Sequence, residues 1–176
     1  MVVPTYNPSP DLAFLSAALP ELEHYILSEE LYWPLGGADL PRLTFGGIFL
    51  AFSRLDAAAL TLSSTQAASL AQIKSALDTV RAKWPAAIDR KLEREIKSRL
   101  DLWSAFLQDC ADNPRSCAEN YPQQVTYRAM LTLMLAALTR PLPADSPHLA
   151  RLAAADAQLR ARFRPGPFAW DPMLEA

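Results

Sequence analysis

The amino-acid sequence predicts an all-α protein, a single-domain bundle of six to seven helices over residues 1–176. Ala and Leu supply 58 of the 176 residues and Val and Ile only 9, and Ala and Leu enter helices easily whereas β-branched residues favour strands. The chain has 5 glycines and no Asn-Gly or Asp-Gly pair that would signal a hairpin. A chain of this length has room for one core and little more.

The 15 prolines mark the boundaries of the predicted helices, because proline suits the first turn of a helix and breaks its interior. Ser63 and Gln66 have the spacing of a capping box, and Ser9 and Ser146 are predicted N-caps. The predicted helices span residues 10–18, 20–32, 41–58, 64–83, 85–111, 122–139 and 147–163. Six of them begin at or beside Pro10, Pro20, Pro41, Pro85, Pro122 and Pro147.

Two predicted helices are amphipathic, since their apolar residues recur at helical spacing and form one stripe each. We expect both stripes to face the core. The stripe of 85–111 consists of Ile88, Leu92, Ile96, Leu100, Trp103, Phe106, Leu107 and Cys110, and that of 64–83 consists of Leu70, Ile73, Leu77 and Val80.

Two other segments, about 43–55 and 125–139, are apolar nearly all round and are predicted to be central helices surrounded by protein. Gly46 and Gly47 are costly inside a helix unless they let a neighbour approach closely. The apolar runs 43–53 and 129–139 are 11 residues each, well short of the roughly 20 that cross a bilayer. The side chains expected to be most buried are Phe45, Phe49, Phe52, Met130, Leu133, Met134 and Leu138.

Two segments outside these helices combine large aromatic residues with proline and glycine. They are residues 32–37 and the C-terminal tail, residues 164–176. Apolar area of this kind normally packs on protein. We expect the tail to be extended and to lie on its own bundle, with a neighbouring copy or another protein as the alternative.

The overall charge does not indicate binding to nucleic acid or to an anionic membrane, since the net charge is −2 and the pI is near 5.7. Residues 1–6 carry neither the basic nor the apolar region of a signal peptide, so a soluble cytoplasmic protein is expected. Arg outnumbers Lys 13 to 4, which together with so much Ala is typical of a GC-rich bacterial genome. In a cytoplasm Cys110 and Cys117 would be reduced thiols, although their places on either side of Asn113-Pro114 also allow a disulfide.

One pair of side chains has metal-ligand spacing. Glu21 and His24 lie on one helix face, as in helical di-iron proteins, but such sites need two Glu-x-x-His pairs and two further glutamates. The second histidine, His148, follows a helix-starting proline and has no such partner. We therefore predict no metal site, with Glu21 holding His24 at the edge of the core.

The run 89–99 is the densest in charge, and its basic face could contact phosphates. Glu93 and Asp101 lower the positive potential of that face. The run is therefore predicted to be a solvated helix face with Glu95–Arg99 and Glu93–Lys97 pairs. The basic face consists of Arg90, Arg94 and Lys97.

No phosphate-binding loop, nucleophile elbow or cysteine with a plausible histidine partner is present, so we assign no catalytic, cofactor-binding or metal-binding residue. The predicted function is that of a non-enzymatic helical protein acting through contact with another protein or with itself. One alternative is a small-molecule-binding or enzymatic bundle with a pocket near His24, Tyr25, Tyr32 and Trp33. A second alternative is a nucleic-acid accessory protein that uses the face of Arg90, Arg94 and Lys97.

Overall fold

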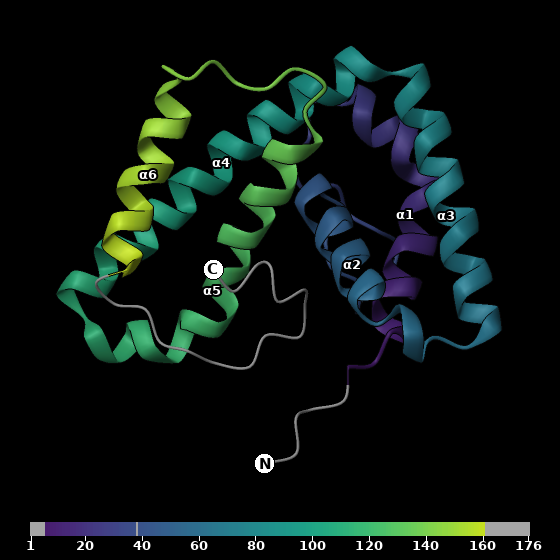
Figure 1. Ribbon diagram of the computed structural model, residues 1–176, viewed down its shortest axis with the longest axis horizontal. Coiled ribbons are helices and arrows are strands. Elements are labelled where there is room, and N and C mark those ends of the chain that lie inside the picture. Colours follow the sequence, from purple (N-terminus) through teal and green to yellow (C-terminus); the bar gives the residue numbers. More distant parts are fainter. Residues whose placement is uncertain (1–5, 38, 161–176) are drawn as a thin grey trace.

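The computed structural model describes residues 6–37 and 39–160 and confirms the predicted all-α bundle (Figure 1). Within the described residues, the isolated bridge between Trp33 and Leu43 is the only β pairing. The helices are α1 (Ser9–Leu27), α2 (Phe45–Ala57), the short 3-10 helix η1 (Ala59–Thr61), α3 (Ser64–Lys83), α4 (Pro85–Asp112), α5 (Pro114–Ala137) and α6 (Pro147–Arg160).

The longest helix, α4, connects the two ends of the bundle. In Figure 1 it runs diagonally behind α5, from the top of α3 to the lower left of the view. α1 and α3 pack together on one side, and α5 and α6 both pack on α4 at the other. α2 lies between α1 and α5, so it joins the two sides. The predicted stripe on α4 is buried except for Phe106, which is half-buried.

The prediction of a central helix is confirmed for α2. Its residues Phe45, Ile48 and Leu55 are buried, and its first turn lies close to both α4 and α5. A Cβ atom on Gly46 would lie 2.8 Å from Oε1 of Glu95 and 3.1 Å from Cβ of Met130. Glycine at this position therefore admits side chains of α4 and α5 that no larger residue would allow.

α5 is enclosed less completely than predicted, because it packs on α4 and α2 but leaves one side open to solvent. Thr132 and Ala136 are exposed along its outer side, and Leu133 and Leu135 beside them are half-buried. The sequence reads as apolar all round because small residues occupy the outward positions. Of the side chains predicted to be most buried, Phe45, Met134 and Leu138 are buried, whereas Phe49, Phe52, Met130 and Leu133 are half-buried.

Two prolines lie inside helices, so the breaks predicted at Pro20 and Pro122 are wrong. Pro20 is exposed, and the apolar stripe of α1 continues across it from Leu15 to Leu22, both buried. Burial on either side of the proline outweighs the missing hydrogen bond of its nitrogen. α5 begins at Pro114, two residues after the end of α4, and passes through Pro122.

The predicted caps are confirmed at two of three helices. Ser63 and Gln66 form a complete capping box on α3. Oγ of Ser146 accepts the backbone N–H of His148 at 3.3 Å, at the start of α6. Ser9, in contrast, is the first residue of α1, and the N-cap position is Pro8.

The start of α2 also differs from the prediction, because the helix begins at Phe45 and not at Pro41. Its cap is Thr44, whose Oγ1 accepts the backbone N–H of Gly47 at 3.0 Å.

Cys110 and Cys117 form a disulfide, so the expectation of two reduced thiols is wrong. The Cα atoms of the two residues are 4.8 Å apart. The reason is the abrupt reversal at Pro114, which places the last turn of α4 beside the first turn of α5. The bond thereby ties together the two helices that pack most extensively on each other.

Residues 161–163 of the last predicted helix and the whole C-terminal tail, residues 164–176, lie outside the described residues. Across the part of the chain that the structure describes, no helix combines the length and the apolar character that a membrane span requires.

Replacing both Cys110 and Cys117 by Ala should lower the free energy of unfolding by about 2–3 kcal/mol, because the bond closes a short loop and restricts the unfolded chain. Urea denaturation measures this loss. Dithiothreitol should destabilise the original chain by a similar amount and leave the double variant unchanged. Equal stability of both proteins in oxidising buffer would contradict the prediction.

Candidate functional site

The most unusual polar feature of the bundle is a row of three charged residues on α4, which we call the α4 polar row. Lys91, Glu95 and Arg99 are spaced four residues apart, so they lie on one side of the helix, and all three are buried. The predicted Glu95–Arg99 pair is formed, with 3.3 Å between Nη2 and Oε1, but its predicted exposure to solvent is wrong. The segment 28–44, which connects α1 to α2, contacts the two ends of the row, and the first turn of α2 contacts its middle.

Glu95 is fully buried and caps the N-terminus of α2. Its Oε2 accepts the N–H of Phe45 at 2.8 Å, and its Oε1 accepts the N–H of Gly46 at 3.0 Å. These N–H groups have no partner within their own helix, and the carboxylate lies at the positive end of the helix dipole. The hydroxyl of Tyr25 donates to Oε2 from a longer distance, 3.5 Å. Glu95 thus complements the local cap, Thr44, from 50 positions further along the chain than Phe45.

Arg99 balances the charge of Glu95. Its Nη2 also donates to Oγ1 of Thr44 at 3.2 Å. The guanidinium lies against the rings of Tyr32 and Tyr127, 5.4 and 5.0 Å from their centroids. Burial raises the pKa of the Glu95 carboxyl above its ordinary value, while Arg99 and the two N–H groups act in the opposite direction.

Lys91 performs the corresponding role at the end of α1. Its Nζ donates to the carbonyl oxygen of Ser28 at 2.7 Å and lies 4.4 Å from the ring centroid of Tyr25. A cation at this place complements the C-terminus of the helix. Burial, with a contribution from Arg94, lowers the pKa of Lys91. The α4 polar row therefore holds the end of α1 and the start of α2.

The aromatic segment 32–37 packs on its own protein. The hydroxyl of Tyr32 hydrogen-bonds Oγ of Ser98 at 2.9 Å, and Nε1 of Trp33 donates to Glu21 at 3.3 Å. Glu21 thus binds an indole, and the predicted role of holding His24 at the core edge is wrong, because His24 is exposed. The prediction that this segment packs on protein is confirmed.

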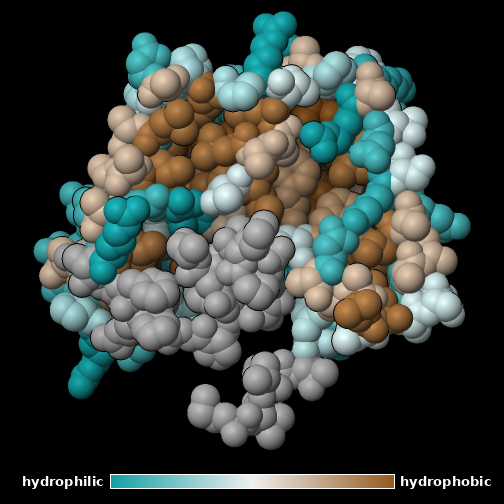
Figure 2. All heavy atoms as spheres, in the orientation of Figure 1, coloured by the Kyte–Doolittle hydropathy of each residue, from teal (hydrophilic) through white to brown (hydrophobic). Residues whose placement is uncertain are grey.

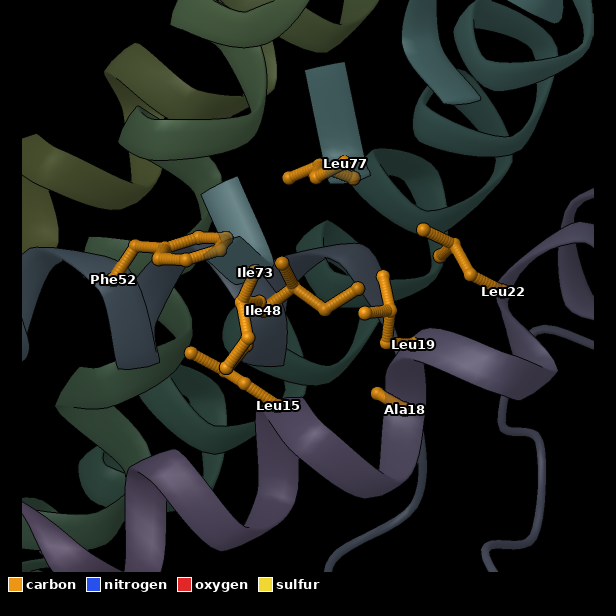
Figure 3. A pocket seen from close by; sticks show the side chains of 8 residues that line it. All are labelled: Leu15, Ala18, Leu19, Leu22, Ile48, Phe52, Ile73 and Leu77. Atoms are coloured by element: carbon orange, nitrogen blue, oxygen red, sulfur yellow. The ribbon is translucent and has the colours of Figure 1, made fainter. Parts of the chain in front are cut away.

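The residues of the predicted small-molecule pocket are engaged in these packing contacts. Tyr25 is buried between Glu95 and Lys91, whereas His24 is exposed on the same helix. A separate pocket lies between α1, α2 and α3, lined by apolar side chains such as those of Leu15 and Ile73 (Figure 3). Its free space of about 10 Å³ is that of one water molecule, so it is a packing gap and not a ligand site.

The basic face of α4 carries acidic partners. Arg94 pairs with Glu29 at 2.7 Å, and Lys97 pairs with Asp101 at 3.1 Å. The predicted Glu93–Lys97 pair is therefore wrong, since Lys97 reaches the next turn instead. The structure favours the predicted solvated face for these exposed residues. Among residues 6–37 and 39–160, no three His, Cys, Asp or Glu side chains are placed to hold a metal ion.

The second notable feature is an apolar surface between α5 and α6. Arg128 of α5 reaches Asp156 of α6, with 2.6 Å between Nε and Oδ1. Leu135 lies two turns beyond Arg128, so it is on the side of α5 that faces α6, and Leu149 stands two turns before Asp156 on the matching side of α6. Leu142 lies in the connection between the two helices.

We call this surface the α5–α6 wedge and define it by Leu135, Leu142 and Leu149, which are half-buried. Figure 2 shows apolar side chains gathered broadly over α4, α5 and α6 in the upper part of the view. The sequence signal for the wedge was present in the apolar run 129–139, which reads equally well as a helix buried on every side.

Replacing Glu95 by Ala should lower the free energy of unfolding by about 3–5 kcal/mol, because Arg99 and two N–H groups of α2 would lose their buried partner. Glu93→Ala is the matched control, since Glu93 is exposed on the same helix and should change stability by less than about 0.5 kcal/mol. Chemical denaturation followed by circular dichroism measures both. Equal effects of the two substitutions would contradict the capping role of Glu95.

Comparison of the chain with protein-family models, curated proteins and solved structures gave no match. Its function is therefore argued from its own residues.

Proposed function

We propose that this chain is a non-enzymatic helical protein that acts through protein–protein contact, and that the α5–α6 wedge is its contact surface. The observation that carries the proposal is the apolar surface in Figure 2, over α4, α5 and α6. Monomeric proteins seldom leave broad apolar surfaces open to water, and such surfaces usually mark interaction sites.

The contacts of the buried charged side chains favour a protein-binding function over a catalytic one. Each member of the α4 polar row binds backbone or side-chain groups of the same chain. A catalytic acid or base needs a free face toward a substrate, and the partners of Glu95 occupy its two oxygens. The charged groups therefore serve the fold, and the apolar surface is the feature left for recognition.

A second copy of the chain is the partner that the charge balance favours. Contact between two identical chains places the same surface on both sides of the interface. A net charge of only −2 per chain produces little repulsion between copies. The partly exposed Arg128–Asp156 pair adds a polar group beside the leucines, as in the rim of ordinary interfaces.

Replacing Leu135 by Glu should abolish self-association, because the charge would have to be buried in the interface. Sedimentation velocity from about 1 to 200 µM, a range that covers typical weak dimers, measures the change. Leu60→Glu is the matched control: Leu60 is fully exposed on η1, away from the wedge, so that variant should associate like the original chain. Circular dichroism establishes that both variants fold.

Two outcomes would overturn the homo-oligomer. One is a chain that stays monomeric throughout this range, both as it stands and without residues 165–176. The other is equal loss of association in Leu135→Glu and Leu60→Glu, which would show that the contact lies elsewhere.

The cytoplasmic location is a further part of the proposal, and the Cys110–Cys117 disulfide provides its test. A cytoplasmic protein keeps such a pair reduced, whereas exported proteins retain it. If the chain is cytoplasmic, the disulfide seen in the structure is opened in cells, so trapping thiols with an alkylating reagent as cells are lysed should label both cysteines, counted by mass spectrometry. An unlabelled, disulfide-bonded chain would contradict a cytoplasmic location and place the protein in an oxidising compartment.

A further inference from the structure

We propose that the C-terminal segment, residues 161–176, is the internal ligand of the α5–α6 wedge and competes with a second copy for it. The wedge and this segment adjoin in the chain, because α6 forms one side of the wedge and ends at Arg160. The docking of the segment on the wedge is argued from their adjacency in the chain and does not depend on the proposed function. Its effect on self-association rests on the proposed function.

The length of the segment is sufficient to reach all of the wedge. α6 has 14 residues, so its axis is about 21 Å long. The 16 residues 161–176 can extend over at most about 50 Å. A chain that turns back at Arg160 therefore passes Asp156 and Leu149 and reaches Leu142 with residues to spare.

The composition of the segment suits an apolar groove. The wedge offers leucine side chains, and the segment offers large aromatic and aliphatic ones. Pro165, Pro167 and Pro172 disfavour a helix and reduce the conformational entropy lost when an extended segment docks. The large apolar residues of the segment are Phe163, Phe168, Trp170, Met173 and Leu174.

Attachment to the same chain gives this segment an advantage over a partner. A short flexible connection produces an effective concentration in the millimolar range. A segment that binds the wedge with a dissociation constant below about 1 mM thus occupies it in most molecules. A second copy at micromolar concentration must displace it, so the segment sets the concentration at which copies associate.

The first test is binding in trans, which requires no self-association. A synthetic peptide of residues 161–176 is titrated into the chain truncated after residue 160, at a concentration where that chain is monomeric. Saturable binding tighter than about 1 mM is expected. A peptide with Phe168→Ser and Trp170→Ser, and a truncated chain with Leu135→Glu, should each weaken binding at least tenfold. No saturation by 1 mM, or equal binding of the altered peptide, would overturn the proposal, whatever the behaviour of the protein variant.

The second test compares self-association of the full and truncated chains by sedimentation velocity. Truncation should strengthen association by tenfold or more, because the competitor is gone. Weaker association after truncation would show that the segment lies on the neighbouring copy, and unchanged association would show that it does not cover the contact surface. Either result overturns competition within one chain. Peptide binding with no self-association in either chain would instead leave the docking standing and overturn the proposed homo-oligomer.

Discussion

The position of α2 depends on one buried carboxylate. Glu95 binds the N–H groups of Phe45 and Gly46 from the middle of α4, so the first turn of α2 is fixed to the longest helix of the bundle. Gly46 is required there, because a side chain at that position would collide with the carboxylate. A buried charge is costly by itself, and Arg99 offsets that cost from the next turn of α4. The central helix is thus held in place by a cap that is remote in sequence.

The same helix that carries this cap organises the connection between α1 and α2. Lys91 binds the end of α1, and Arg99 binds Thr44 at the other end of the connection. Ser98 lies between them on α4 and binds Tyr32. The polar groups of α4 on this side are consequently committed to the fold, and the one aromatic segment in the described part of the chain is docked on it. The surface that we propose for recognition is apolar and lies between α5 and α6.

Local signals in the sequence predicted the helical class, the capping box at Ser63 and the buried stripe of α4, because each depends on residues within a few turns of one another. Several predictions that depend on tertiary contacts failed. Glu95 and Arg99 have the spacing of an ordinary surface pair, and no local pattern indicates that residues 28–44 cover them. Pro20 is tolerated because packing on both sides of it outweighs its local preference. The wedge could be predicted only as an apolar helix, since the sequence does not say which elements cover it.

The apolar half of α5 connects the fold to the proposed function. α2 and α4 cover its inner side, where Leu131 and Met134 are fully buried, while Leu133 and Leu135 on its flanks keep part of their surface. Leu135 packs against the core with part of its side chain and leaves the rest only half-buried. Leucine there carries a cost in solubility unless something covers it. The Arg128–Asp156 pair bridges α5 and α6 next to this surface, with 2.6 Å between Nε and Oδ1. In the proposals above, this cover is either a second copy of the chain or the segment that follows α6, and the attached segment loses less entropy on docking than a separate chain does.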